Sequence, residues 1–231
     1  MSDAMPKKII KKTKIKIVPI LVLIFALLFG YFLVKYLLSI KIQNIYITGN
    51  KYLNDEYIIE KAGLKDYPSI LKTMSFNVRE LLLDDSFINE AKVNKSLFGT
   101  IEIDVSENSV LFYKEYDKMY VLSNLEEVSN IPFTFSPVRV INYIPDNVYK
   151  TFTNKFIEIK DDVKDKISEI KYDPSEYDNN RFLFYMVDGN YVYVTSLKLD
   201  SLNYYNEIYP TLDNKKGILY LDAGEYFEIK E

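Results

Sequence analysis

The chain has 231 residues, of which 48% are hydrophobic and 15% aromatic, and its formal net charge is −4. Such a hydrophobic share excludes a chain that is disordered throughout. The sequence contains neither cysteine nor histidine, which excludes disulfide bonds, cysteine- and histidine-based metal sites, thiol nucleophiles and histidine catalysis.

The first 16 residues form a basic tail. Six lysines lie between Lys7 and Lys16, and Asp3 is the one acid of this segment, so the tail carries +5 and the remaining residues −9. Lysine-rich tails bind nucleic acid in some proteins, but this one directly precedes a long apolar run. We therefore interpret it as the cytoplasmic flank of a membrane segment.

The apolar run from Ile17 to Val34 contains 18 consecutive uncharged residues, and its extension to Leu38 is long enough to cross a hydrocarbon core of about 30 Å. Cytoplasmic flanks are rich in lysine, which predicts that the N-terminus is inside the cell and that residues from Ser39 onward are outside. A cleaved signal peptide is the alternative, but its apolar region is shorter and ends at a small-residue cleavage site. The sequence favours an uncleaved anchor at residues 17–38.

A strand, a turn and a capped helix follow the anchor directly. Ile45 and Ile47 share one face of a strand, and Gly49-Asn50 supplies the turn. Asn54 is a good N-cap. The helix is expected to bury Ile58, Ile59 and Ala62, and Gly63 ends it at the C′ position. The pattern predicts one β-α unit.

A second helix and two strands complete this part of the chain. The helix is predicted around Asn77–Asp84, where it buries Val78, Leu81 and Leu82. Strands follow at residues 90–97 and 99–108, and the second directs Ile101, Ile103 and Val105 inward. The order β-α-α-β-β within residues 39–106 has a plausible size for a small domain.

Residues 107–231 mix strands and helices. Strands are predicted at residues 109–116 and 118–122, and an amphipathic helix starts at Asp146, with apolar residues at 148, 152, 156, 159 and 163. Asp188-Gly189 joins a hairpin, a further helix covers Leu199–Tyr209, and Gly217–Ala223 is the final strand. The predicted class is α+β.

The sequence contains few candidates for chemistry. Ser69 and Lys72 match the S-x-x-K box of penicillin-binding enzymes, but the companion motifs S-D-N and K-T-G are missing. Adjacent acids occur at residues 84–85, 126–127 and 161–162, and sequence neighbours point apart on helices and strands. We predict no catalytic, cofactor-binding or metal-binding residue.

The pattern I-x-x-I-x-V-x-G-N, followed by A-x-V-x-R-x-x-P-x-x-L-x-I-x-V-x-E, is typical of a module in the DivIB/FtsQ family of bacterial cell-division proteins. The chain resembles this family. The matching residues are Ile42, Ile45, Ile47, Gly49, Asn50, Ala91, Val93, Ile101, Ile103, Val105 and Glu107. Lys95 stands where the family has arginine, and Phe98 where it has proline.

The resemblance implies an N-terminal transmembrane helix, a POTRA domain and a C-terminal β-rich α+β domain. The corresponding segments are a basic cytoplasmic tail (1–16), the anchor (17–38), the POTRA-like domain (39–106) and the β domain (107–231). It implies a cell-membrane protein, single-pass type II, enriched at the division septum.

The implied function is a non-enzymatic divisome scaffold. It links other single-pass membrane division proteins, namely coiled-coil divisome subunits and the septal wall synthase, with no cofactor, nucleic acid or small-molecule substrate. The alternatives are a membrane-anchored cell-wall enzyme and a POTRA-type chaperone or secretion module.

We predict that the final strand, Gly217–Ala223, is the docking edge for a partner. A terminal strand at a sheet edge has unpaired N–H and C=O groups that accept another strand. Leu219 and Leu221 are expected to pack inward, and the predicted partner-binding residues are Ile218, Tyr220, Asp222, Tyr226 and Phe227. The alternative is that these aromatic residues close the domain's own core.

Overall fold

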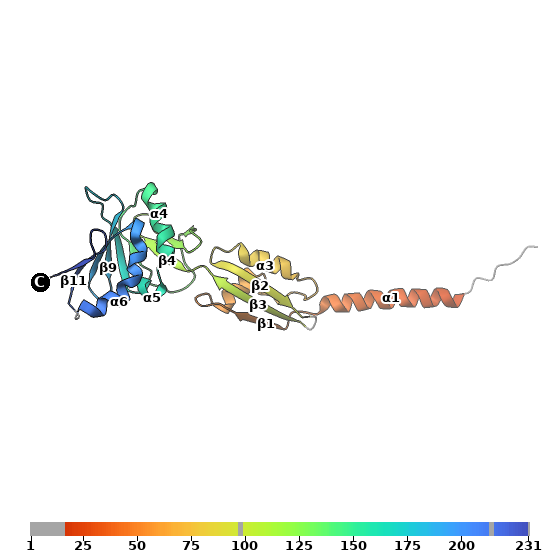
Figure 1. Cartoon of the computed structure of the whole chain (residues 1–231). Coiled ribbons are helices and arrows are strands. Elements are labelled where there is room, and N and C mark those ends of the chain that lie inside the picture. Colours follow the sequence, from red (N-terminus) through yellow and green to blue (C-terminus); the bar gives the residue numbers. More distant parts are fainter. Residues whose placement is uncertain (1–16, 97–98, 213–214, 231) are drawn as a thin grey trace, which may run out of the picture.

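The structure is a computed structural model that describes residues 17–96, 99–212 and 215–230. Within these ranges the chain forms an N-terminal helix, a small sheet with two helices, and a larger sheet with helices packed against it (Figure 1). The predicted α+β class is confirmed. The lysine-rich tail and Phe98 lie outside the described residues.

The N-terminal helix α1 (Ile17–Ser39) stands apart from the rest of the protein, and none of its residues is buried. Its 23 residues extend about 35 Å at 1.5 Å per residue, and the mean hydropathy of an 18-residue stretch within it is 2.9. In the part of the chain that the structure describes, it is the one helix with the length and composition to cross a membrane. These properties fit a membrane anchor.

The first domain has the predicted element order. Its strands are β1 (Asn44–Thr48), β2 (Ile88–Lys95) and β3 (Thr100–Glu107), and its helices are α2 (Asp55–Lys61) and α3 (Ser75–Leu83). Strand β3 lies in the centre, parallel to β1 and antiparallel to β2. Its three inward residues, Ile101, Ile103 and Val105, are buried as predicted.

Local sequence signals fix the ends of α2. The Asn54 side chain accepts a hydrogen bond from the N–H of Tyr57 at 2.8 Å, and Gly63 has a φ of 68° just after the helix. The prediction for Leu81 is wrong, because this side chain is 48% exposed. Val78 and Leu82, four residues apart, face the sheet, and Leu81 lies at the surface beside Gly63.

The second domain is built on a nine-stranded sheet in the order β12-β11-β10-β9-β8-β7-β4-β5-β6. Its strands are β4 (Val110–Lys114), β5 (Met119–Leu122), β6 (Glu127–Val128), β7 (Arg139–Val140), β8 (Ile167–Tyr172), β9 (Arg181–Met186), β10 (Tyr191–Thr195), β11 (Gly217–Tyr220) and β12 (Tyr226–Ile229). The hairpin predicted at Asp188-Gly189 joins β9 and β10. Strand β12 was not predicted.

The helices of this domain are more broken than predicted. The helix expected from Asp146 to Val163 is two helices, α4 (Asp146–Ile157) and α5 (Asp161–Lys164), although all five apolar positions are buried. The helix expected at Leu199–Tyr209 consists of η1 (Ser196–Tyr204), α6 (Tyr205–Ile208) and η2 (Tyr209–Leu212). The apolar positions predicted the buried face correctly, while tight turns decide where each helix ends.

Each sheet has its own core, and aromatic side chains join the two domains. Phe133 of the second domain stacks on Tyr52 at 5.4 Å and meets Phe87 edge-on at 5.9 Å, measured between ring centroids. Leu122 of β5 also belongs to the first core. The C-terminus lies at the end of the molecule opposite α1 (Figure 1). The domain boundary at 106–107 stays a prediction.

Candidate functional site

The predicted docking strand is not an edge strand. Strand β11 pairs with β10 on one side and with β12 on the other, so β12 forms this edge of the sheet. The prediction that Gly217–Ala223 supplies the free edge is therefore corrected. The chain reverses after Leu221, at Gly224 and Glu225 with φ of 138° and 50°, and returns along β11 as one more strand.

Gly217 makes this last pairing possible. A Cβ atom at this position would lie 2.0 Å from the carbonyl oxygen of Glu228 and 2.8 Å from the Phe227 ring. Any side chain here would therefore push β12 away from the sheet. The backbone N–H of Gly217 donates to the side-chain oxygen of Asn190 at 3.0 Å, which fixes the start of β11.

The register determines which groups of β12 are free. The N–H of Lys230 donates to the carbonyl of Lys216 at 2.9 Å, and the strands pair Ile218 with Glu228 and Tyr220 with Tyr226. In an antiparallel ladder every second residue pair is hydrogen-bonded. The backbone groups of Phe227 and Ile229 therefore point away from β11, toward the open edge.

The five predicted partner-binding residues divide between the two faces of the sheet. Leu219 and Leu221 are buried beneath β11, as expected. Tyr220 and Tyr226 face the outer side, where their rings stack with centroids 4.5 Å apart. Phe227 pairs with Leu219 and packs against the core, so this residue closes the domain, as the alternative for the aromatic residues held.

An aromatic ladder stiffens the outer face beside the edge. The ring of Tyr193 stacks on Tyr220 at 5.5 Å, and the Arg181 guanidinium lies 3.5 Å from the centroid of the Tyr193 ring. Arg181 also binds Asp222 at 2.7 Å, which leaves Asp222 engaged within the domain. Burial and the hydrogen bond to Glu228 raise the pKa of Tyr220 to about 12, so its hydroxyl stays a donor at neutral pH.

A shallow groove of about 570 Å³ runs along the inner side of the same hairpin. It lies between the helical segment at Tyr204–Leu212 and the strands β11 and β12, with Leu219 and Phe227 in its wall. The hairpin thus offers an open backbone edge, an exposed Tyr226 and a groove on its inner side.

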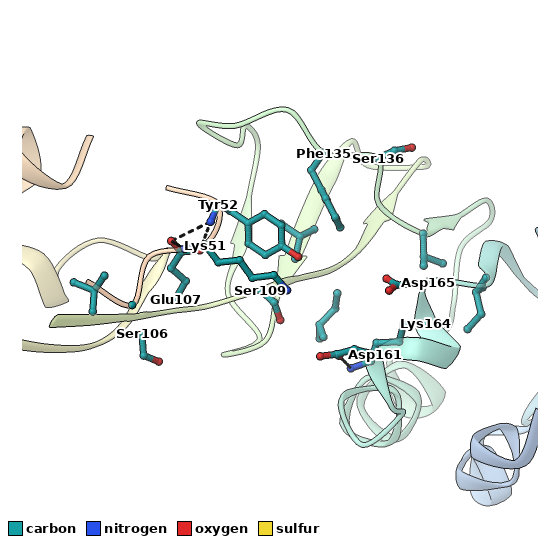
Figure 2. A pocket seen from close by; sticks show the side chains of 16 residues that line it. Lys51, Tyr52, Ser106, Glu107, Ser109, Phe135, Ser136, Asp161, Lys164 and Asp165 are labelled. Carbon is teal, nitrogen blue, oxygen red and sulfur yellow. Dashed lines mark hydrogen bonds and ion pairs between the residues drawn. The ribbon is translucent and has the colours of Figure 1, made fainter. Parts of the chain in front are cut away.

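A second hollow, of about 440 Å³, lies where the two domains meet (Figure 2). The Glu107 carboxylate accepts hydrogen bonds from the N–H groups of Lys51 and Leu53 at 2.8 and 3.0 Å, and from that of Tyr52 at 2.9 Å. On the other wall, Lys164 donates to the carbonyl of Ile157 and to Asp161. The hydrogen bonds of Glu107 lie within the first domain and those of Lys164 within the second, so each side chain fixes the backbone of its own domain beside the hollow.

The acidic pairs also have structural roles. Asp85 accepts hydrogen bonds from the Tyr57 hydroxyl and the Phe87 N–H and pairs with Lys61. Glu127 binds the buried Lys114. No group of three or more acids that could hold a metal ion occurs among the described residues. Ser69 and Lys72 lie in the loop before α3, where Lys72 is exposed.

The sequence matches known proteins of one family. The family model of the POTRA domain, FtsQ-type, matches residues 40–108. The cell division protein DivIB of Geobacillus kaustophilus is 30% identical over 195 residues, which cover 80% of this chain and 74% of the relative. The chain belongs to the DivIB/FtsQ family of cell division proteins.

Other DivIB proteins match over similar lengths. The DivIB of Bacillus subtilis is 29% identical over 81% of this chain and 74% of its own length, and that of Listeria monocytogenes is 26% identical over 96% and 85%. The solved extracytoplasmic domain of Geobacillus stearothermophilus DivIB aligns with 47% of this chain and 96% of its own, at 24% identity and a TM-score of 0.37. The family assignment rests on the sequence matches.

The family pattern has a physical explanation in this DivIB-family chain. A Cβ atom at Gly49 would lie 2.1 Å from the carbonyl oxygen of Val105, so only glycine fits the turn after β1. Glu107, the last residue of the pattern, accepts hydrogen bonds from three N–H groups of the loop after β1, at residues 51–53. Lys95, which replaces the usual arginine, donates to the carbonyls of Ile70 and Thr73 at 3.0 and 2.7 Å.

Sequence reasoning missed strand β12 and the role of Glu107. The sequence identifies Glu107 as a residue of the family pattern but does not predict its hydrogen-bond donors, because these lie 54–56 residues earlier in the chain. A signal for β12 was present in the alternation of Tyr226, Phe227, Glu228 and Ile229 after Gly224. Four residues are too few for periodicity alone to identify a strand.

Proposed function

We propose that this DivIB-family protein is a non-enzymatic scaffold of the division machinery that holds other single-pass membrane division proteins together outside the cytoplasm. Its relatives are named cell division proteins. The observation that carries the proposal is the open edge of β12, which lies at the end of the molecule opposite α1 (Figure 1). A scaffold of this kind works through such surfaces and needs no reactive group.

The proposed partner contact is the addition of a strand to β12. The N–H and C=O groups of Phe227 and Ile229 are available for main-chain hydrogen bonds, and Tyr226 provides an exposed ring beside them. Of the five residues predicted from the sequence, Tyr226 and Tyr220 contribute to the outer face. Asp222 and Phe227 support the hairpin from within the domain, and the half-buried Ile218 lies on the same face of β11 as Tyr220.

The distance of this edge from the anchor favours partners that project from the membrane. Coiled-coil divisome subunits, each with one membrane span, have that form and are the proposed occupants of the edge. The septal wall synthase is the proposed partner of the assembled complex, so that wall synthesis starts at the septum.

Topology is tested with a reporter that is active only outside the cytoplasm. Fused after Glu231, the reporter is expected to be active, because six lysines precede the apolar segment and no comparable cluster follows it. A stable fusion that stays inactive would overturn the orientation and the scaffold proposal with it. A fusion of the same reporter before Met1 serves as the inactive control.

Localisation in dividing cells tests the role itself. A fluorescent protein fused to the N-terminus is expected to gather at midcell as the septum forms. Uniform distribution around the cell would favour a POTRA-type chaperone or secretion module instead. Turnover of peptidoglycan fragments by the purified protein would establish the third possibility, a membrane-anchored wall enzyme.

A further inference from the structure

The loop between α2 and α3 lies at the end of the first domain that α1 enters (Figure 1). This connector, residues 62–74, is hydrogen-bonded to the chain immediately after the apolar helix. The N–H of Ile70 donates to the carbonyl of Ile40 at 2.9 Å, and the N–H of Ile42 donates to the carbonyl of Pro68 at 3.0 Å. Wherever α1 leaves a bilayer, the connector is therefore at the bilayer surface.

The connector is held in a fixed shape from within the domain. Leu64 and Ile70 are buried in the first core. Lys95, at the end of β2, donates to the carbonyls of Ile70 and Thr73, and the Thr73 hydroxyl donates to the carbonyl of Ser69. The outward side chains of the connector thus keep their direction without support from a partner.

Several of those outward side chains are large and apolar, beside the exposed charged residues Lys65, Asp66 and Lys72. Met74 is 59% exposed, Phe76 in the first turn of α3 is 64% exposed, and Leu71 and Tyr67 are exposed as well. Because side chains tilt toward the N-terminus of their helix, Phe76 points from α3 back toward the end of the domain near α1. Lys72 follows Leu71 in the chain, and Lys41 pairs with Ser69 of the connector; both lysines are exposed.

We propose that the connector rests on a phospholipid bilayer and inserts Leu71, Met74 and Phe76 into its headgroup region. Apolar side chains flanked by lysines are the chemistry of surfaces that bind anionic membranes. The proposal relies on α1 as the membrane anchor of the proposed function. The contact between the connector and the bilayer adds a second attachment to the one through α1. It fixes the tilt of the first domain, which a single attachment at Ser39 leaves free, and so it sets the direction in which the end that carries β12 points from the membrane.

The full chain in vesicles of phosphatidylglycerol and phosphatidylcholine provides the test. Because the sequence has no cysteine, Met74→Cys or Phe76→Cys carries a single fluorescent label. Lipids with a spin label at a shallow acyl position are expected to quench both labels, since interfacial apolar faces lie about 5–10 Å into the headgroup and acyl boundary. Recovery of the protein with floated vesicles tests the anchor separately.

Two labelled controls distinguish contact from mere proximity. Asn77→Cys is one residue from Phe76 and turned by about 100° around α3, and Tyr177→Cys lies on the second domain. Weaker quenching at position 77 than at position 76, and none at position 177, supports the contact. Equal quenching at positions 76 and 77, or none at 74 and 76 in protein that floats with vesicles, overturns it and leaves the anchor intact.

A charge-matched pair of double variants completes the test. With the label on Leu71→Cys, the changes Met74→Glu and Phe76→Glu are expected to abolish quenching, because carboxylates replace the inserted side chains. The control changes Asn77→Glu and Leu81→Glu add the same charge at exposed positions of α3. Quenching that survives the first pair, or disappears equally with the second, contradicts the proposal.

Discussion

Replacing Ile103 with Asp is expected to unfold the first domain. Ile103 lies in the central strand β3, pairs with Ile47 on one side and Val93 on the other, and is 1% exposed. Loss of a buried isoleucine side chain costs about 2–5 kcal/mol, and a buried carboxyl group without a partner costs about 1–3 kcal/mol more. Small domains are stable by roughly 5–15 kcal/mol, so this change removes most of the margin.

Hydrogen exchange measured by mass spectrometry checks this result segment by segment. Residues 40–231 provide a soluble form, which we expect to fold because α1 buries none of its residues. In Ile103→Asp the amides of β1, β2 and β3 are expected to lose protection. The second core, built around Phe152, Phe156 and Phe182, is separate and is expected to keep protection in β8, β9 and β10.

Two substitutions control for position and size. Ile103→Val removes one methylene group and is expected to cost about 1 kcal/mol. Glu102→Ala changes an exposed side chain on the opposite face of β3, where most changes stay within about 0.5 kcal/mol. Full protection of β3 in Ile103→Asp would show that this position tolerates a charge and would contradict the assigned core.

The first domain was predictable because its signals are local. The alternation of Ile101, Ile103 and Val105 marks a half-buried strand, and Asn54 and Gly63 mark the two ends of α2 within a few residues of the backbone groups they satisfy. The burial predicted for Leu81 is wrong because Val78, Leu81 and Leu82 fit one helical stripe equally well. Only the position of the sheet decides which of them is buried.

The edge of the second sheet was not predictable from such signals. Strand β11 pairs in parallel with β10 and antiparallel with β12. The pairing with β12 depends on the close approach of Glu228 to Gly217. These two residues lie on different strands, so the pattern within either strand does not predict the contact. The sequence identified the correct region and the inward positions Leu219 and Leu221. It assigned the free edge to the wrong strand, because the alternation over the four residues of β12 is too short to identify a further strand.

Ile229→Pro is expected to abolish partner binding and to leave the fold intact. The N–H of Ile229 points away from β11, so proline removes a hydrogen-bond donor that the domain itself does not use. The Ile229 side chain is 53% exposed, so little packing is lost. A strand added to β12 would lose that donor and meet the proline ring at the edge.

Glu228→Pro is the matched control one residue away. The N–H of Glu228 faces Ile218 in the hairpin, so proline at this position removes a bond within the domain and is expected to detach β12. Co-purification of division proteins with the full chain from mild detergent measures binding, and thermal unfolding of residues 40–231 measures the fold. Ile229→Pro is expected to lower only the first, whereas Glu228→Pro lowers both.

The two variants separate the open edge from the side chains around it. Proline at position 229 leaves Tyr226, the Tyr220 ring and the inner groove in place, so a partner that recognises those surfaces alone still binds. Normal co-purification with Ile229→Pro would therefore rule out strand addition and direct attention to the aromatic face. Loss of binding with an unchanged unfolding temperature supports strand addition to β12, because apart from the backbone N–H the substitution replaces only the exposed Ile229 side chain.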